Sequence, residues 1–167
     1  MRSLPATPRL LVLTLAAAGF VALNLAGTPA LAAGAAHDHG HAAAAAKPLP
    51  AGKRWATDAP LREGMTEIRH ALEPQLEAIH KNQLTPEQYQ AIAAKTEQQV
   101  AHIVANCKLP PDADAALHVI IGQIGESTEA MSGKSKARPR DGAVKLLGAL
   151  NEYGRTFDHP GWKKLRG

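Results

Sequence analysis

Apolar residues recur at intervals of three and four along most of the chain after residue 53, which is the period of a helix with one buried face. The clearest series runs at spacings of 4, 3, 4, 4 and 3 and consists of Leu61, Met65, Ile68, Leu72, Leu76 and Ile79. Three more series of this kind lie within 89–107, 117–131 and 144–157. No segment alternates between apolar and polar residues as a half-buried strand does. The sequence therefore predicts an all-α protein with four helices.

Short polar residues and prolines predict where each helix begins. Asp58 stands two residues before Pro60 and can accept a hydrogen bond from the first turn of a helix. Residues 85–88 (TPEQ) form a capping box with proline at the first helical position. We expect Asp112 to cap the third helix and the fourth helix to begin near Asp141.

Three residues inside the predicted helices should shape their course. Pro74 lacks an N–H group for the preceding turn, so the first helix is expected to bend there. Gly122 and Gly125 lower the helix propensity in the middle of the third helix. We therefore expect a neighbouring element or a ligand to approach the backbone closely at these two glycines.

The four helices and their short links predict a specific arrangement. Four such helices bury their apolar faces most economically as an antiparallel up-down four-helix bundle, here over residues 53–167. This arrangement places the beginning of the first helix beside the end of the fourth. The residues of the fourth helix expected to face the core are Val144, Leu147, Leu150, Tyr153 and Phe157.

The first 32 residues have the pattern of an export signal. Arg2 and Arg9 occur there without an acidic residue, an apolar run covers 10–25, and Ala30 and Ala32 are the small residues that a signal peptidase reads. We expect cleavage near Ala32 and a periplasmic or secreted mature protein; an uncleaved anchor is the alternative, which the short apolar run disfavours. The whole chain has 19 basic and 15 acidic residues, and cleavage would remove two of the basic ones. The formal charge would therefore fall from +4 to +2. A chain this close to neutral is not expected to bind nucleic acid, and no later segment is expected to span a membrane.

Residues 33–52 are rich in alanine and predict a flexible leader. This leader carries His37, His39 and His41, with Asp38 between the first two histidines. Imidazole nitrogens on a flexible chain can bind Cu(II), Zn(II) or Ni(II). The pattern predicts a transition-metal site at these three histidines, with an affinity lowered by the entropy of ordering a loose segment. The alternative is a solubilising linker that binds nothing.

Other residues exclude several kinds of site. Cys107 is the only cysteine, which excludes an intramolecular disulfide, a C-x-x-C-H haem attachment and a cysteine-rich metal site. Two E-x-x-H pairs, Glu67 with His70 and Glu77 with His80, fall in one predicted helix, whereas di-iron bundles carry such pairs on facing helices. The sequence contains no nucleophile elbow, P-loop or H-E-x-x-H motif. We therefore expect a non-catalytic protein in which His70 and His80 lie on the surface.

Three segments of the chain resemble segments of a known family. They are LREGMTEIRHALE at 61–73, IIGQIGESTEAM at 120–131 and RTFDHPGW at 155–162. These segments are similar to the periplasmic four-helix cytochromes, namely the soluble b-type cytochrome and its cytochrome c′ relatives, and the wider pattern also resembles bacterial DnrO-like proteins. The resemblance implies a cytochrome b/c′-like bundle that holds a non-covalent haem for electron transfer, with Met65 and His159 as its axial ligands.

The sequence thus predicts a binding function and leaves the ligand open. The leading hypothesis is a periplasmic, non-catalytic protein for a transition metal such as copper or zinc, which uses the leader histidines and has a second site at Met65 and His159. One alternative is a non-covalent b-type haem protein in electron transfer. Another is a ligand-free bundle that contacts an envelope protein. Each of these two residues also has a purely structural alternative: Met65 can fill the core, and His159 can cap the end of the fourth helix.

Overall fold

The computed structural model describes Pro50 and residues 52–167, and most of these residues are helical. The four long helices are α1 (Ala59–Leu72), α3 (Pro86–Asn106), α4 (Pro111–Met131) and α5 (Pro139–Thr156). A 3₁₀ turn, η1 (Glu73–Gln75), and a short helix, α2 (Leu76–His80), follow α1. The predicted all-α class is confirmed for this part of the chain. None of its helices combines the length and apolar character needed to cross a membrane.

Side-chain caps begin two of the long helices as predicted. At α1, Asp58 Oδ1 accepts a hydrogen bond from the Leu61 N–H over 3.0 Å. At α3, the Thr85 hydroxyl accepts from the Gln88 N–H, and the Gln88 side chain accepts from the Thr85 N–H. Both caps satisfy N–H groups that have no partner within their own helix.

The predicted starts of α4 and α5 are wrong by about two residues. The N-cap of α4 is Pro110, so Asp112 lies inside the first turn, where its charge still favours the positive end of the helix dipole. Helix α5 begins at Pro139 rather than near Asp141. In both helices a proline occupies the first position, because its fixed φ suits that position and its missing N–H is not needed there.

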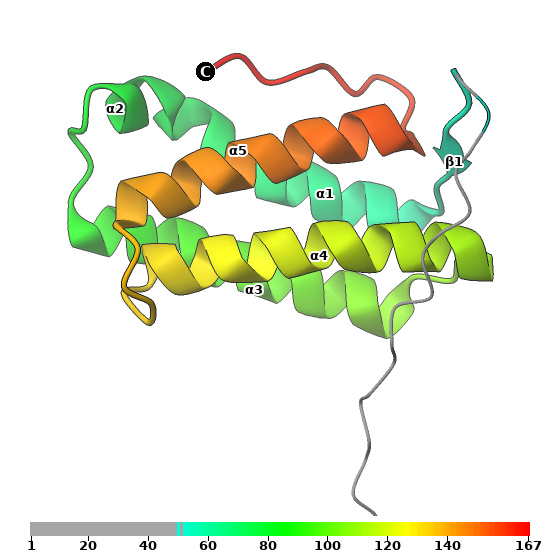
Figure 1. The fold of residues 1–167 in the computed structure, drawn as a ribbon, viewed down its shortest axis with the longest axis horizontal. Coiled ribbons are helices and arrows are strands. Elements are labelled where there is room, and N and C mark those ends of the chain that lie inside the picture. The colour runs from blue at the N-terminus through cyan, green and yellow to red at the C-terminus, as the bar shows by residue number, and fades with distance from the viewer. Residues whose placement is uncertain (1–49, 51) are drawn as a thin grey trace, which may run out of the picture. The chain divides into compact units, whose positions relative to one another are not determined.

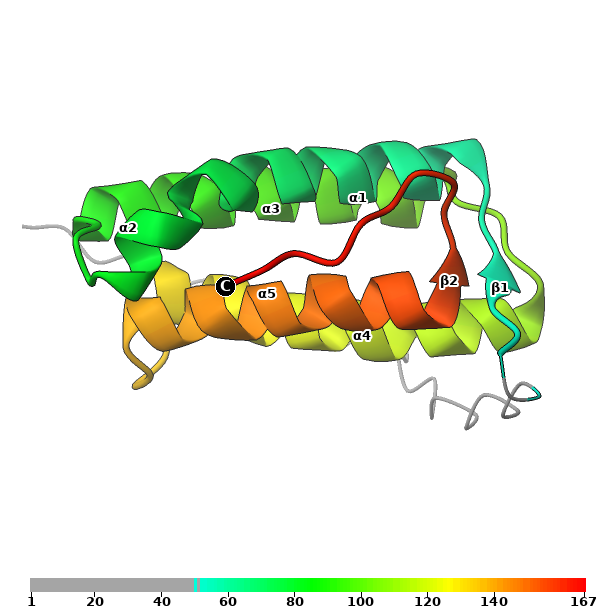
Figure 2. The ribbon, with the colours of Figure 1, turned by 90° about the horizontal axis from the view of Figure 1, so that it is seen from above.

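The predicted bend at Pro74 is confirmed. Helix α1 stops at Leu72, and η1 carries the chain through the proline into α2. Figure 2 shows α2 turned out of the line of α1 towards the side on which α5 lies. Asn82 then ends this segment with a positive φ of 53°, and Arg140 Nε ties it to α5 by donating to the Ile79 carbonyl over 3.0 Å.

The four long helices lie side by side with their axes along a common direction (Figures 1 and 2). Helix α4 packs most extensively on α5, α1 packs on α3, and α3 packs on α4. Helices α1 and α5 contact each other much less. Seen from above in Figure 2, the segment that follows α5 runs over these two helices, and Figure 1 shows it at the outer edge of the fold above α5.

A short parallel strand pair joins the two ends of the helical part. Strand β1 (Trp55–Ala56) pairs with β2 (Phe157–Asp158), with Trp55 opposite Phe157 and Ala56 opposite Asp158. The prediction that the chain contains no strand is wrong at this point, because two residues are too few to produce an alternating pattern. The pairing holds the beginning of α1 beside the end of α5, as the sequence predicted.

The core is built from the predicted apolar faces with two exceptions: Val104, predicted to widen the buried face of α3, is 67% exposed, and the beginning of the α5 face is displaced by one residue. Ala143 and Leu146 are fully buried, whereas Val144 is 42% exposed. A Cβ atom at Gly142 would lie 2.7 Å from the Ser127 carbonyl oxygen of α4. Helix α5 therefore approaches α4 through its smallest residues, which turns Val144 outward. The rest of the predicted face behaves as expected, with Leu150, Tyr153 and Phe157 buried and Leu147 partly buried.

The predicted close approach at Gly122 and Gly125 is wrong. A Cβ atom at either position would have no neighbour within 4 Å. Close packing occurs instead at Gly142 and at Gly64, where a Cβ atom would lie 2.5 Å from the Ile103 side chain of α3.

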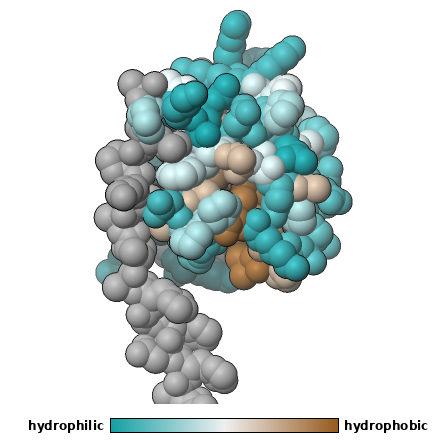
Figure 3. Space-filling model, turned by 90° about the vertical axis from the view of Figure 1, so that its right-hand side faces the viewer, coloured by the Kyte–Doolittle hydropathy of each residue, from teal (hydrophilic) through white to brown (hydrophobic). Residues whose placement is uncertain are grey.

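The described surface exposes few large apolar side chains. They are Val104, Val119 and Val144. Seen from the end at which α4 begins, the surface is mostly hydrophilic with one small hydrophobic patch (Figure 3). Single exposed valines are normal on soluble helical proteins and do not indicate a binding surface.

Candidate functional site

The segment that follows β2 forms the walls of two recesses. We call residues 159–167 the C-terminal strap. The first recess, the histidine pocket, has a volume of about 330 Å³ and lies between Thr66, Arg69 and His70 of α1 and the strap from His159 to Lys163. The second, the basic groove, has a volume of about 700 Å³ and lies between the α1–α2 segment and the strap residues Lys163, Lys164 and Arg166. Arg69 and Lys163 border both recesses.

The strap is anchored to α5 by one apolar side chain and one amide. Leu165 is 2% exposed. The Asn151 side chain accepts a hydrogen bond from the Leu165 N–H over 2.8 Å and donates one to the Leu165 carbonyl over 3.1 Å. This pairing satisfies both backbone groups of a residue that lies outside regular structure.

A second anchor holds the middle of the strap against α1 and α5. The Trp162 ring occupies the space over Gly154, where a Cβ atom would lie 2.5 Å from two ring atoms. Tyr153 packs edge-on against this ring, with 4.9 Å between the centroids. From the other side, Arg69 donates a hydrogen bond to the Lys163 carbonyl, and its guanidinium carbon lies 5.3 Å from the Trp162 ring centroid.

His159 is held in position by Tyr153, and its surroundings favour the neutral imidazole. Its Nδ1 atom lies 2.9 Å from the hydroxyl oxygen of Tyr153, which is itself fully buried. Partial burial lowers the pKa of His159, and the positive charges of Arg62 and Arg69 lower it further. Neutral imidazole is the form that binds metal ions. Within the described part of the chain, Nε2 of His159 has no hydrogen-bond partner.

His70 borders the same pocket as His159. The sequence predicted a surface histidine, and the side chain is indeed 63% exposed. Its Nδ1 atom lies 3.4 Å from a carboxylate oxygen of Glu67. Both histidines thus engage Nδ1 and have no described partner at Nε2. The sequence did not predict this shared pocket, because the course of the strap, which brings His159 to the same recess as His70, has no local sequence signal.

Met65 and His159, the predicted second site, do not border a common recess among those described above. Met65 is fully buried in the core, and the neighbouring residue Thr66 is the one that reaches the histidine pocket. Because Met65 has no exposed surface, a haem bound between Met65 and His159 would have to displace the side chains that are packed on Met65. These residues do not fit a haem in this packing.

The three leader histidines, His37, His39 and His41, lie outside the described residues. Within 52–167, no cluster of three or more His, Cys, Asp or Glu side chains is arranged to hold a metal ion. A metal site in this part of the chain would therefore draw on two such side chains at most, and the remaining ligands would come from elsewhere.

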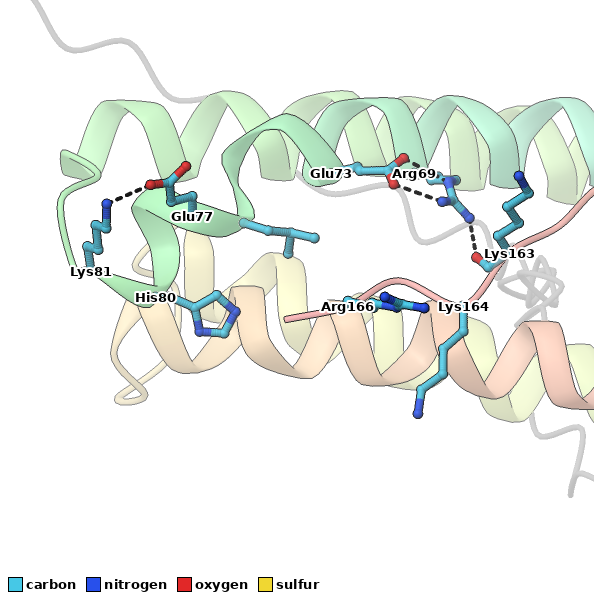
Figure 4. Close-up of a pocket in the computed structure, with 9 residues that line it drawn as sticks. Arg69, Glu73, Glu77, His80, Lys81, Lys163, Lys164 and Arg166 are labelled. Carbon is cyan, nitrogen blue, oxygen red and sulfur yellow. Dashed lines mark hydrogen bonds and ion pairs between the residues drawn. The ribbon is translucent and has the colours of Figure 1, made fainter.

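The two walls of the basic groove differ in charge. On the α1–α2 wall, Arg69 binds Glu73 through two hydrogen bonds of 2.8 and 2.9 Å, and Lys81 binds Glu77 over 2.6 Å (Figure 4). The hydrogen bonds from Arg69 lower the pKa of Glu73. The strap opposes this wall with three exposed cations, Lys163, Lys164 and Arg166. Leu76 of the α1–α2 wall also lines the groove and is 8% exposed.

Cys107 lies apart from both recesses and is not suited to nucleophilic chemistry. Burial raises the pKa of its thiol to about 12, and the nearby carboxylate of Asp58 adds to this effect. The Cys107 thiol donates a hydrogen bond to Asp58, whose other carboxylate oxygen accepts one from the Lys108 N–H over 2.6 Å. These contacts tie the end of α3 to the start of α1.

No protein family, curated protein or solved structure matches this chain. The similarity to periplasmic four-helix cytochromes therefore stays a prediction from the sequence. A functional assignment has to rest on the chemistry of the two recesses and of the leader.

Proposed function

We propose that this chain is an exported, non-catalytic protein that binds a transition-metal ion, copper or zinc, and that His159 is a ligand in its helical part. One observation carries the proposal: Tyr153 positions His159, burial and the charges of Arg62 and Arg69 lower its pKa, and it borders the same pocket as His70. We infer that the metal binds between the Nε2 atoms of these two histidines.

The contacts of both imidazoles support this chemistry. Metal-binding histidines usually engage their second ring nitrogen in a hydrogen bond, which fixes the orientation of the ring. Tyr153 supplies this contact to His159, and Glu67 supplies it to His70. Arg69 and Lys163 border the pocket and repel a metal cation. Glu67 offsets only part of this repulsion, because its other carboxylate oxygen pairs with Lys95 over 3.5 Å.

We propose that His37, His39 and His41 of the leader form a metal site of their own. Copper(II) is favoured, because it binds nitrogen ligands most strongly among the divalent first-row ions. In this proposal Met65 is a core residue of α1, as its complete burial suggests.

We also propose the antiparallel up-down arrangement and the cytochrome b/c′-like relationship for the helical part. The packing of α1 on α3, α3 on α4 and α4 on α5, together with the β1–β2 pairing, supports the arrangement. The signal pattern in residues 1–32 supports a periplasmic location. The mass of the protein recovered from the periplasm tests this part, because cleavage near Ala32 removes a defined segment.

Non-covalent haem, bound by Met65 and His159, is the second candidate. The β1–β2 pairing favours this candidate, because the pairing keeps Met65 and His159 at the end of the fold where α1 begins and α5 ends. A haem could bind there only if the packing that buries Met65 opened. A Soret band after haem titration would support this candidate, and its absence would leave the metal proposal. A ligand-free bundle that contacts an envelope protein is the outcome if neither ligand binds.

Calorimetric titration with Cu²⁺ and Zn²⁺ tests the metal proposal. We expect H159Q, H70Q and a triple His→Ala variant at 37, 39 and 41 each to weaken binding, because each removes a ligand. H118Q is the matched control: His118 is also exposed, and its Nδ1 contacts only Asp114 of its own helix. Unchanged affinity in both H159Q and H70Q would exclude the site in the helical part, whatever the leader variant does.

A further inference from the structure

The basic groove carries charge that metal binding does not use. Both carboxylates on its α1–α2 wall are already paired, Glu73 with Arg69 and Glu77 with Lys81. The three strap cations form no ion pair within the described part of the chain, and all three are exposed. The groove therefore has an excess of positive charge on one wall and a balanced opposite wall.

We propose that the basic groove binds an acidic, extended segment of a partner protein. The cations of the strap occur at 163, 164 and 166 in a non-helical stretch, so they are spread along a line of about 10 Å rather than converging on a point. In Figure 4 the Lys163 side chain extends towards α1, whereas the Lys164 side chain extends to the opposite side of the strap, so the charges lie on both sides of this line. Carboxylates repeated along an extended peptide match a linear row of cations.

The recess itself favours a peptide over a small anion. A small anion needs donors that converge on it, and Arg69, the most buried cation here with 15% of its side chain exposed, already engages Glu73, the Lys163 carbonyl and the Trp162 ring. The exposed cations that remain are spread along the strap. They suit several separate carboxylates better than one compact ligand.

The apolar part of the groove favours a peptide over a membrane surface. Leu76 of the α1–α2 wall lines the groove and is nearly buried, so only a chain that enters the groove can reach it. A flat layer of anionic headgroups would touch the outer cations without reaching Leu76. A peptide with alternating acidic and apolar residues would satisfy both the strap cations and Leu76.

Fluorescence anisotropy with a labelled peptide tests the proposal. The probe is a short peptide in which Glu alternates with Leu, and the control peptide carries Gln in place of Glu. We expect the purified protein to bind the Glu peptide and not the Gln peptide, with affinity that falls as salt is added. Loss of discrimination between the two peptides would overturn the proposal.

A matched pair of variants locates the binding. K164E/R166E reverses two strap cations that lie outside the histidine pocket, and we expect it to weaken peptide binding about tenfold or more. K108E/K136E is the control, because it changes the net charge equally at two exposed positions outside the groove. Equal losses in both variants would show attraction to net charge alone and would overturn the proposal. Leu165 and Asn151 are untouched, and an unchanged circular dichroism spectrum verifies folding.

Two further measurements separate the competing outcomes. Binding to vesicles of anionic lipid, with no binding of the Glu peptide, would assign the groove to a lipid surface and overturn the proposal. The inference also stands apart from the metal proposal, because neither Lys164 nor Arg166 is a proposed ligand. Retained Cu²⁺ affinity in K164E/R166E, together with lost peptide binding, is therefore the result expected if both proposals hold.

Discussion

The amide side chain of Asn151 binds both backbone groups of Leu165, as a neighbouring β-strand would. The two hydrogen bonds measure 2.8 and 3.1 Å, and they join the middle of α5 to the strap fourteen residues later. A single helical side chain thus orders a segment that has no regular structure of its own. Both recesses depend on this anchor, because the strap forms one wall of each.

Replacing Asn151 by alanine should release the strap. N151A leaves the Leu165 N–H and carbonyl without partners, so we expect the free energy of unfolding to fall by about 1–3 kcal/mol. Urea denaturation measures this loss, and faster tryptic cleavage after Lys163 or Lys164 reports release of the strap. N106A is the control, since Asn106 is exposed and bonds only within its own helix. Equal stability of N151A and N106A would show that the strap does not depend on the amide.

Adding one methyl group at Gly154 should displace Trp162. In G154A the new Cβ would lie 2.5 Å from the ring, so we expect a loss of about 1–3 kcal/mol and a red shift of the tryptophan emission. G148A is the matched control on the same helix, where a Cβ meets nothing within 4 Å. That variant should gain up to about 1 kcal/mol from helix propensity and keep the emission of the parent protein. A red shift in G148A, or none in G154A, would contradict the packing described for Trp162.

The titration of His159 should reduce stability in mild acid. Burial and two arginine charges lower its pKa in the folded chain below the ordinary value of 6.5, so below that value the unfolded chain takes up the proton first. The stabilising contribution is therefore complete above about pH 6.5 and declines as the pH falls towards the folded pKa. Urea denaturation from pH 7.5 to 5 should show a smaller decline for H159Q than for the parent. Parallel curves for the two proteins would refute this role, and H118Q, whose histidine is exposed, should follow the parent.

The thiol of Cys107 should react slowly in the folded protein. Its pKa is raised to about 12, and the thiolate is the reactive form, so a disulfide reagent at pH 8 should modify it far more slowly than a model thiol. Unfolding in urea removes both the burial and the Asp58 contact and should restore an ordinary rate. D58N at neutral pH separates the two causes: a partial gain in rate is expected, because burial remains. Rapid modification of the folded parent protein would contradict the environment described here.

The helices could be predicted because each depends on residues close to one another in the sequence. The apolar spacing from Leu61 onward and the capping box at 85–88 each encode a helix or its start locally. The displaced face of α5 could not be obtained in this way, because both Val144 and Leu146 are apolar. Only the close approach of Gly142 to α4 decides which of the two turns inward.

The recesses could be predicted only in part, because they depend on contacts between distant segments. The juxtaposition of the start of α1 with the end of α5 followed from the arrangement of the helices, and it placed His159 near α1. The course of the strap did not follow, because the sequence KKLRG has no periodicity and its anchor is the distant side chain of Asn151. Because the course of the strap could not be predicted, His70 was one of several expected surface histidines. The pocket that it shares with His159 could not be predicted either.

Arg69 and Lys163, which join the two sides of the histidine pocket, are separated by 94 positions in the chain. Fragments and half-formed intermediates that lack either side cannot contain the pocket. A metal ion bound there would bind only the folded chain. The melting temperature would therefore rise with the concentration of free metal. Under the metal proposal, the lifetime of the protein in its compartment would then follow the supply of the ion that it carries.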